Sequence, residues 1–222
     1  MNKTTEFIDW GLISYADAYR KQKELFDNNI QKKAEGQATN NAIVFCEHPH
    51  VLTLGKNASQ TNLLFSEDFL KTKGVELFQV DRGGDVTYHG PGQIVGYPII
   101  DLENFGIGLK EYISRMEESI IRLLDLYSVK AGRLKSATGV WIEADTPGKA
   151  RKICAIGVRS SRFITMHGFA LNISTDLTYF QLINPCGFID KGVTSLEKEL
   201  GNPVDMSKLK ADLKNCLQEV FH

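Results

Sequence analysis

The twelve residues from Arg82 to Gln93 constrain this chain more than any other stretch. They read Arg-Gly-Gly-Asp-Val-Thr-Tyr-His-Gly-Pro-Gly-Gln and lie between two apolar runs. Gly83-Gly84 permits a positive φ or a close approach of the backbone to a ligand, and Gly90-Pro91-Gly92 favours a tight turn. The stretch therefore predicts two bends with polar side chains between them, either in a ligand-contacting loop or in two solvated hairpin turns. It is not a phosphate loop, because no Lys-Ser or Lys-Thr follows the last glycine.

Length and charge limit the class of protein. The chain has 222 residues, 42% of them hydrophobic, which suffices for one well-buried core and is short for two ordinary domains. We therefore expect a single domain over residues 1–222. A net charge of −1 gives no global electrostatic reason to bind nucleic acid or an anionic membrane. No apolar run approaches the ~20 residues that span a bilayer, and the N-terminal segment lacks the apolar core of a signal peptide. The sequence predicts a cytoplasmic protein.

The pattern of apolar residues predicts helices and short strands without a regular βαβ alternation. Helices are expected to start after Ser14 and Ser66, to cover 110–127 and to start again near Ser207. The polar residues 31–41 indicate a loop. Strands are expected at 42–46, 51–54, 75–80, 86–88, 94–102, 140–143, 151–158 and 163–173, the last interrupted by Gly168. Together these elements predict a mixed α+β fold with a largely antiparallel or mixed sheet.

The cysteines and histidines do not form a metal-binding pattern. Four scattered cysteines without a CxxC pair indicate thiols in a reducing compartment rather than a disulfide framework or a zinc site. Cys46 and Cys216 lie in apolar patterns typical of a core. His48 and His50 flank a proline, which favours a turn before the next strand over a metal site. We expect no bound metal.

Cys186 is the cysteine most suited to chemistry. It lies in Asn-Pro-Cys-Gly-Phe, where a proline and a glycine hold the thiol on a tight turn, as a nucleophile or as a structural turn cysteine. A thiol with a pKa of about 8.5 is mostly protonated at neutral pH, so a cysteine nucleophile needs a cationic or basic neighbour. Lys152, His89 and His167 are the candidates, and their spacing does not choose among them.

The segment that contains Lys152 has two further features. In a regular strand the side chains of Lys152, Cys154 and Ile156 share one face, and Lys152 is either functional or an edge-strand lysine whose ammonium reaches water. The run from Gly148 to Arg162 also holds cations and no acid. It predicts a basic rim for an acidic partner, formed by Lys149 and Arg162 at the ends of the run, or a solvated hairpin.

Four motifs taken together identify a family. The stretch from Arg82 to Gln93 is followed by Lys-Ile-Cys-Ala-Ile-Gly-Val-Arg, by His-Gly-Phe-Ala-Leu-Asn and by Asn-Pro-Cys-Gly-Phe. From about Phe45 to Leu196 the chain closely resembles the lipoyl (octanoyl) transferases of lipoate biosynthesis. The resemblance implies a fold like that of biotin and lipoate protein ligases. It also implies transfer of an octanoyl or lipoyl group from acyl carrier protein to a lysine of a lipoyl domain.

The resemblance also implies roles for individual residues. Cys186 carries the acyl group as a thioester, and Lys152 lowers the pKa of its thiol. The segments that match substrate-contacting parts of the family are Arg82, Gly83, Gly84, Asp85, Val86, Thr87, Tyr88 and His89, then Ala155, Ile156 and Gly157, then Gly168, Phe169 and Ala170.

Cofactors and partners follow from the same resemblance. The energy for transfer resides in the donor thioester, so neither ATP nor another cofactor nor a metal is required. Acyl carrier protein is the expected donor. Lipoyl domains of 2-oxoacid dehydrogenase complexes and the glycine cleavage H protein are the expected acceptors.

One departure and two alternatives remain. Cys154 stands where the family usually has alanine, and a shared face with Lys152 would bring it near Cys186 and permit a reversible disulfide. An ATP-dependent lipoate or biotin ligase shares the fold, but its Ser-Gly-Gly-Gly or Gly-Arg-Gly-Arg nucleotide loop does not occur in this sequence. A non-catalytic module that binds acyl groups is the second alternative.

Overall fold

A computed structural model of the chain describes residues 2–59, 62–135, 137–184 and 191–221. The N-terminal half contains β1 (Thr5–Leu12), α1 (Tyr15–Ala34), β2 (Asn41–Glu47), β3 (Val51–Leu54), α2 (Glu67–Thr72), β4 (Glu76–Gln79), β5 (Val86–His89), β6 (Gln93–Ile99) and α3 (Leu102–Phe105). The C-terminal half contains α4 (Leu109–Leu126), β7 (Ala131–Leu134), β8 (Ala137–Ile142), β9 (Arg151–Ser161), β10 (Ile164–Asn172), the 3₁₀ helix η2 (Leu177–Leu182), β11 (Gly192–Val193), α5 (Leu196–Leu200) and α6 (Met206–Val220).

The strands form two sheets. The larger sheet has the order β1-β2-β6-β10-β9-β8-β7, and β11 pairs with β9 outside this path. The β1–β2 and β11–β9 pairs are parallel, whereas β2–β6, β6–β10, β10–β9, β9–β8 and β8–β7 are antiparallel. In the smaller sheet β3 pairs with β4 in parallel and with β5 antiparallel. The predicted α+β fold with a mainly antiparallel sheet is confirmed.

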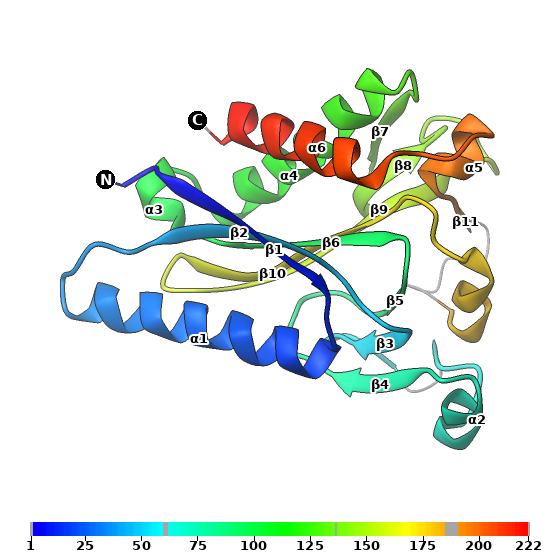
Figure 1. The fold of residues 1–222 in the computed structure, drawn as a ribbon, viewed down its shortest axis with the longest axis horizontal. Helices are drawn as coiled ribbons and strands as arrows, with labels where there is room; N and C mark the ends of the chain where they lie inside the picture. The colour runs from blue at the N-terminus through cyan, green and yellow to red at the C-terminus, as the bar shows by residue number, and fades with distance from the viewer. Residues whose placement is uncertain (1, 60–61, 136, 185–190, 222) are drawn as a thin grey trace.

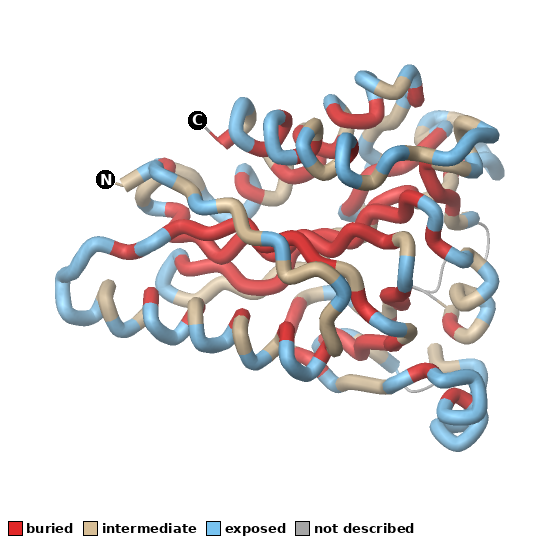
Figure 2. Tube along the Cα trace, viewed as in Figure 1, coloured by how far each residue is buried: buried red, intermediate tan, exposed pale blue. Residues whose placement is uncertain are grey.

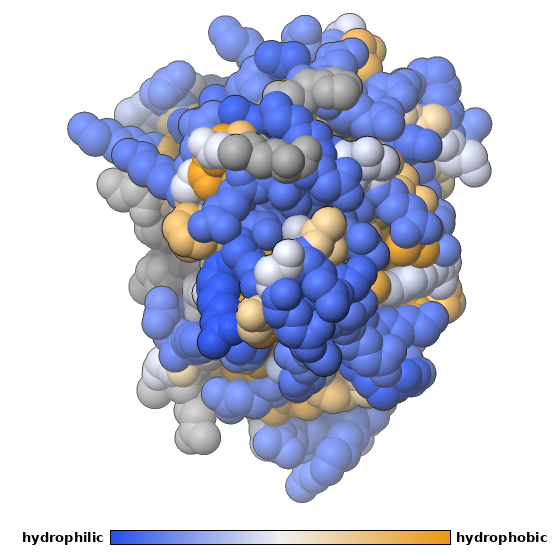
Figure 3. Space-filling view, turned by 90° about the vertical axis from the view of Figure 1, so that its left-hand side faces the viewer, coloured by the Kyte–Doolittle hydropathy of each residue, from blue (hydrophilic) through white to orange (hydrophobic). Residues whose placement is uncertain are grey.

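Helices cover both faces of the larger sheet (Figure 1). Helix α1 packs against β10 and β6 on one face, while α4 and α6 pack together on the other. The main core lies between α4, α6 and the sheet, and Figure 2 shows the buried residues along the central strands. Seen from the side of the α1–β2 connection, the surface carries mostly hydrophilic side chains with small apolar patches (Figure 3). In the described ranges, no helix combines the length and apolarity needed to cross a membrane.

Local sequence explains most helix boundaries. The Ser14 hydroxyl accepts the Asp17 N–H at the start of α1, and the Ser66 hydroxyl accepts the Phe69 N–H at the start of α2. The predicted helices after these serines are confirmed. Helix α1 runs to Ala34, however, so the loop predicted from residue 31 begins too early. Its last turn carries lysines near the helix C-terminus, where cations are favourable.

The strand predictions missed β1, β7 and β11, and one predicted strand needs a correction. Strand β10 continues through Gly168 without the predicted interruption, and its irregularity lies at the preceding residue, His167, whose φ is +62°. Residues 82–85 connect β4 to β5 of the smaller sheet and contact the larger sheet, where the Gly83 N–H donates to the Val158 carbonyl over 2.9 Å. The Arg82 stretch is therefore held directly over β9.

Candidate active site

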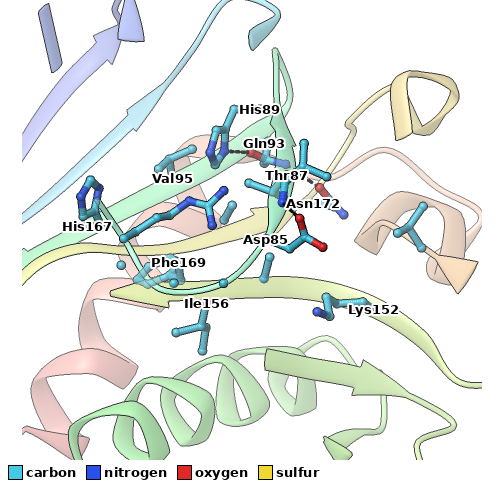
Figure 4. A pocket seen from close by; sticks show the side chains of 18 of the residues that line it. Asp85, Thr87, His89, Gln93, Val95, Lys152, Ile156, His167, Phe169 and Asn172 are labelled. Atoms are coloured by element: carbon cyan, nitrogen blue, oxygen red, sulfur yellow. Dashed lines mark hydrogen bonds between the residues drawn. The ribbon is translucent and has the colours of Figure 1, made fainter. Parts of the chain in front are cut away.

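A cavity lies between the loop that precedes β5 and the strands β9 and β10 (Figure 4). Lys152 lines this cavity. So do all the predicted substrate-contacting residues except Gly83 and Tyr88, namely Arg82, Gly84, Asp85, Val86, Thr87, His89, Ala155, Ile156, Gly157, Gly168, Phe169 and Ala170. Segments that are up to about ninety positions apart in the sequence thus surround one space, because β10 pairs with β9 and the Gly83 N–H bonds to Val158 of β9.

Cys186 lies outside the described residues. The described residues that flank its segment reach the same cavity, since Phe180 lines it from one side of the sequence and Lys191 from the other. The residues that lead into this segment are fixed by backbone contacts with Asn62 and Leu63. The Asn184 N–H donates to the Asn62 carbonyl over 2.9 Å, and Leu63 forms an antiparallel bridge with Ile183, which is buried.

A β-bulge separates Lys152 from Cys154. Val140 pairs with Cys154 and the next residue, Trp141, pairs with Lys152, so Ile153 is an extra residue in β9. Lys152 lines the cavity with its Nζ 4.7 Å from the centre of the Trp141 ring. Cys154 is fully buried in the main core on the other side, and burial raises the pKa of its thiol.

The prediction that Lys152, Cys154 and Ile156 share one face is therefore wrong at its first step. Strand alternation fails where the bulge inserts an unpaired residue. The suggested disulfide between Cys154 and Cys186 relied on that shared face and loses its basis. Cys46 and Cys216 are buried, as the apolar patterns predict.

Gly83 and Tyr88 have other contacts than the cavity. Gly83 makes the backbone hydrogen bond to Val158 described above. The Tyr88 ring is fully buried in the core of the smaller sheet, its hydroxyl lies 2.8 Å from His50 Nδ1, and it stacks on Tyr179 of η2. Because alternate residues of a strand point to opposite faces, Thr87 and His89 face the cavity and Tyr88 does not.

Residues 82–85 lie over β9 and form what we call the roof of the cavity. The side chains of Arg82 and Asp85 fix this loop in place. Arg82 is buried, and its Nη2 donates to the Thr53 carbonyl at 2.7 Å and to the Thr53 hydroxyl at 2.9 Å. Asp85 accepts the Val86 N–H and the side-chain amide of Asn62, at 2.7 and 2.5 Å. Both side chains therefore rigidify the loop that carries them.

Burial disfavours the charged form of the candidate histidines. Desolvation, reinforced by the nearby His48, lowers the pKa of His89 to about 3. Desolvation also lowers the pKa of His167, although its Nε2 lies 2.8 Å from an oxygen of Asp81. Of the three neighbours considered for a cysteine nucleophile, Lys152 is the one suited to supply positive charge.

Other cavity residues were not singled out from the sequence. Tyr15 comes from α1, Tyr97 from β6 and Trp141 from β8. Gln93 donates to the Asn172 side chain over 2.9 Å, which ties β6 to β10 at one end of the cavity. The alternation of Gln93, Val95 and Tyr97 is visible in the sequence, but their pairing with β10 is not. No group of three metal-binding side chains occurs among the residues that the structure describes.

Comparison with protein families and curated proteins assigns the chain. The family model of the lipoyl protein ligase A/B catalytic domain matches residues 14–218. An octanoyltransferase from Bacteroides fragilis is 58% identical over 205 residues, which is 92% of each chain. An octanoyltransferase from Parabacteroides distasonis is 56% identical over 215 residues, 97% of each chain.

Solved structures share the fold at low sequence identity. A bi-partite lipoate protein ligase from Thermoplasma acidophilum has a TM-score of 0.73 at 15% identity, covering 98% of this chain and 84% of that one. A biotin protein ligase from Aquifex aeolicus has a TM-score of 0.51 at 10% identity, covering 99% and 69%. With the family model and the curated relatives, these likenesses show that the chain belongs to the lipoyl protein ligase A/B catalytic domain family.

Proposed function

We propose that this protein is an octanoyltransferase of lipoate biosynthesis that transfers its acyl group through a thioester on Cys186. The observation that carries the proposal is one cavity with Lys152 on its wall and an apolar middle, in a chain more than half identical to proteins named octanoyltransferase. Such a cavity suits a saturated acyl chain, whose burial is favourable because it removes apolar surface from water.

The chemistry has two balanced steps. In the first, the Cys186 thiolate attacks the carbonyl carbon of the donor thioester, a new C–S bond forms, and the donor thiol leaves and takes up a proton. In the second, the amine of an acceptor lysine attacks the enzyme thioester, an amide forms with loss of a proton, and the cysteine thiolate is released. Lys152 favours the thiolate by its positive charge and exchanges protons with the reacting groups.

The partners follow from this chemistry. Acyl carrier protein supplies the octanoyl thioester, and the acceptor lysine belongs to a lipoyl domain of a 2-oxoacid dehydrogenase complex or to the glycine cleavage H protein. The donor already contains an activated acyl group, so transfer proceeds without ATP or metal.

Mass spectrometry of the acyl-enzyme tests the proposal. Incubation with octanoyl carrier protein, without ATP, is expected to add one octanoyl group to the wild type, to Cys46→Ala and to Cys216→Ala, but not to Cys186→Ala. Octanoylation of Cys186→Ala at the wild-type rate would show that Cys186 is not the nucleophile. A wild type that modifies a lipoyl domain only with free octanoate and ATP would be a ligase, and one that binds acyl groups without transfer would be a binding module.

A further inference from the structure

Strands β6, β10 and β9 form the floor of the cavity. Residues that pair across these strands lie side by side in rows. Asn172 of β10 pairs with Gln93 of β6 at the first row. Two residues earlier in β10, Ala170 pairs with both Val95 of β6 and Ala155 of β9, and these three residues form the second row. Gly168 pairs with Gly157 at the third row. All these residues line the cavity.

The rows differ in chemistry. The first row is polar, since the Gln93 side chain donates to Asn172 and the Asn172 side chain donates to the Thr194 carbonyl. The N–H of Thr194 donates to the Lys152 carbonyl, which connects this row to Lys152. The second row, with one valine and two alanines, offers only apolar side chains. The polar end of the floor is therefore the Lys152 end, and an acyl chain entering there passes over an apolar row next.

The roof meets the floor at the third row. A side chain at Gly157 would lie 3.0 Å from the Gly83 carbonyl oxygen and 3.1 Å from Arg82 Cδ. The Gly83 N–H donates to Val158, the next residue of β9. The glycine at position 157 thus allows the loop to descend onto β9, and this contact closes the cavity from above.

Three large rings line the cavity, and that of His167, which precedes Gly168 in β10, lies at the same end. Tyr15, Tyr97 and His167 line the cavity and are almost completely buried. His167 is fixed by its Nε2 contact with Asp81 at 2.8 Å and by its backbone N–H, which donates to Gln22. Figure 4 shows His167 and Lys152 at opposite ends of the group of cavity side chains. The first and third rows are four residues apart, which is about 13 Å of strand.

We propose that these rows act as a ruler for acyl chain length, with the thioester carbonyl at the Lys152 end and the terminal methyl against the His167 end. This inference rests on the proposed octanoyl transfer. An octanoyl chain spans the apolar row and stops before the closed third row, while longer chains meet the rings and the descended loop. Position 155 sets the room over the middle of the chain, and His167 sets the limit at its end.

The first test makes room for longer acyl chains at the His167 end of the cavity. His167→Gly removes the ring, and glycine suits the φ of +62° at this position. Acyl loading of Cys186 is measured by mass spectrometry with hexanoyl, octanoyl, decanoyl and dodecanoyl thioesters of carrier protein. Relative to octanoyl, loading of decanoyl is expected to rise by about tenfold or more, the effect of one or two methylenes in an apolar pocket. Val158→Ala is the control, because Val158 packs against the main core on the other side of β9.

The second test shortens the ruler. Ala155→Leu adds bulk at the apolar row and is expected to reduce octanoyl loading by about tenfold or more while hexanoyl loading falls much less. Cys154→Ala, which changes the adjacent core-facing residue, is expected to keep the wild-type length preference.

The outcomes separate this inference from the proposed function. If the wild type loads no acyl group of any length, the proposed function is wrong. If the wild type and both cavity variants load octanoyl well and share one length preference, transfer stands and the ruler is overturned.

Discussion

At the scale of single residues, the bulge at Ile153 determines which side chain of β9 reaches the reacting groups. It turns Lys152 to the cavity and Cys154 to the core. If Lys152 stabilises the thiolate, Lys152→Ala is expected to raise the apparent pKa of the Cys186 thiol by about one to three pH units, since a nearby cation favours the charged form. The pH dependence of Cys186 alkylation measures this. Lys149→Ala is the control, and identical titrations of the two variants would leave Lys152 without an electrostatic role.

His48 makes stability depend on pH. Its Nδ1–H donates to the Ile13 carbonyl at 2.8 Å, its Nε2 accepts from the Tyr97 hydroxyl at 2.7 Å, and burial lowers its pKa to about 4. The folded protein thus binds this proton less well than the unfolded chain, so stability present above about pH 6.5 is lost as the pH falls toward 4. At pH 5 the loss is about 2 kcal/mol.

Urea denaturation at pH 7 and pH 5 checks this expectation. His48→Gln removes the titrating group, so its free energy of unfolding should fall by about 2 kcal/mol less than that of the wild type between these pH values. An equal fall in both proteins would show that His48 is not the source.

At the scale of elements, the Phe169 ring of β10 packs so closely over β6 that glycine is favoured at position 96. A Cβ on Gly96 would lie 2.1 Å from the Phe169 ring, which is buried beside it. Gly96→Ala is expected to lower the free energy of unfolding by about 1–3 kcal/mol, the usual effect of overpacking a core. Gly132→Ala in β7 has no atom within 4 Å of its Cβ and should be nearly neutral. Equal effects of the two variants would contradict the packing argument.

At the scale of the whole molecule, the cations of the run from Gly148 to Arg162 are spread along β9 and beyond both of its ends. Arg151 pairs with Glu143 and Glu199, and Arg159 pairs with Asp81. Lys149 and Arg162 are both exposed but lie beyond opposite ends of this strand, over about 30 Å apart. The prediction that these two residues form one rim is therefore wrong, because an extended strand separates its ends by its full length.

Lys149 remains the candidate of the two for contact with an acidic donor protein, since it precedes the Lys152 end of β9. Lys149→Glu is expected to slow loading from octanoyl carrier protein several-fold at low salt, with a smaller effect at high salt and with a small octanoyl thioester. Arg162→Glu serves as the matched reversal at the far end. Similar losses in the two variants would show an effect of net charge rather than of a local contact.

Much of the fold was predictable because its signals are local. The serine caps of α1 and α2, the apolar face of α4, the apolar run of β3 and the strand-forming residues of β5 depend on residues within a few positions of one another. The pairing of β1 with β2 was not predicted, since parallel pairing depends on distant residues and β1 carries no strong turn signal of its own.

The sequence by itself determined the motifs that gather around the cavity, the strand and helix types, and the glycine positions where backbones come close. Only the tertiary structure decided which side chains of those motifs share the cavity. The bulge at Ile153 separates Lys152 from Cys154, the pleat of β5 turns Tyr88 away, and the β6–β10–β9 register sets the rows of the floor. The reason is physical, because register and bulges are selected by packing between strands that are remote in the chain.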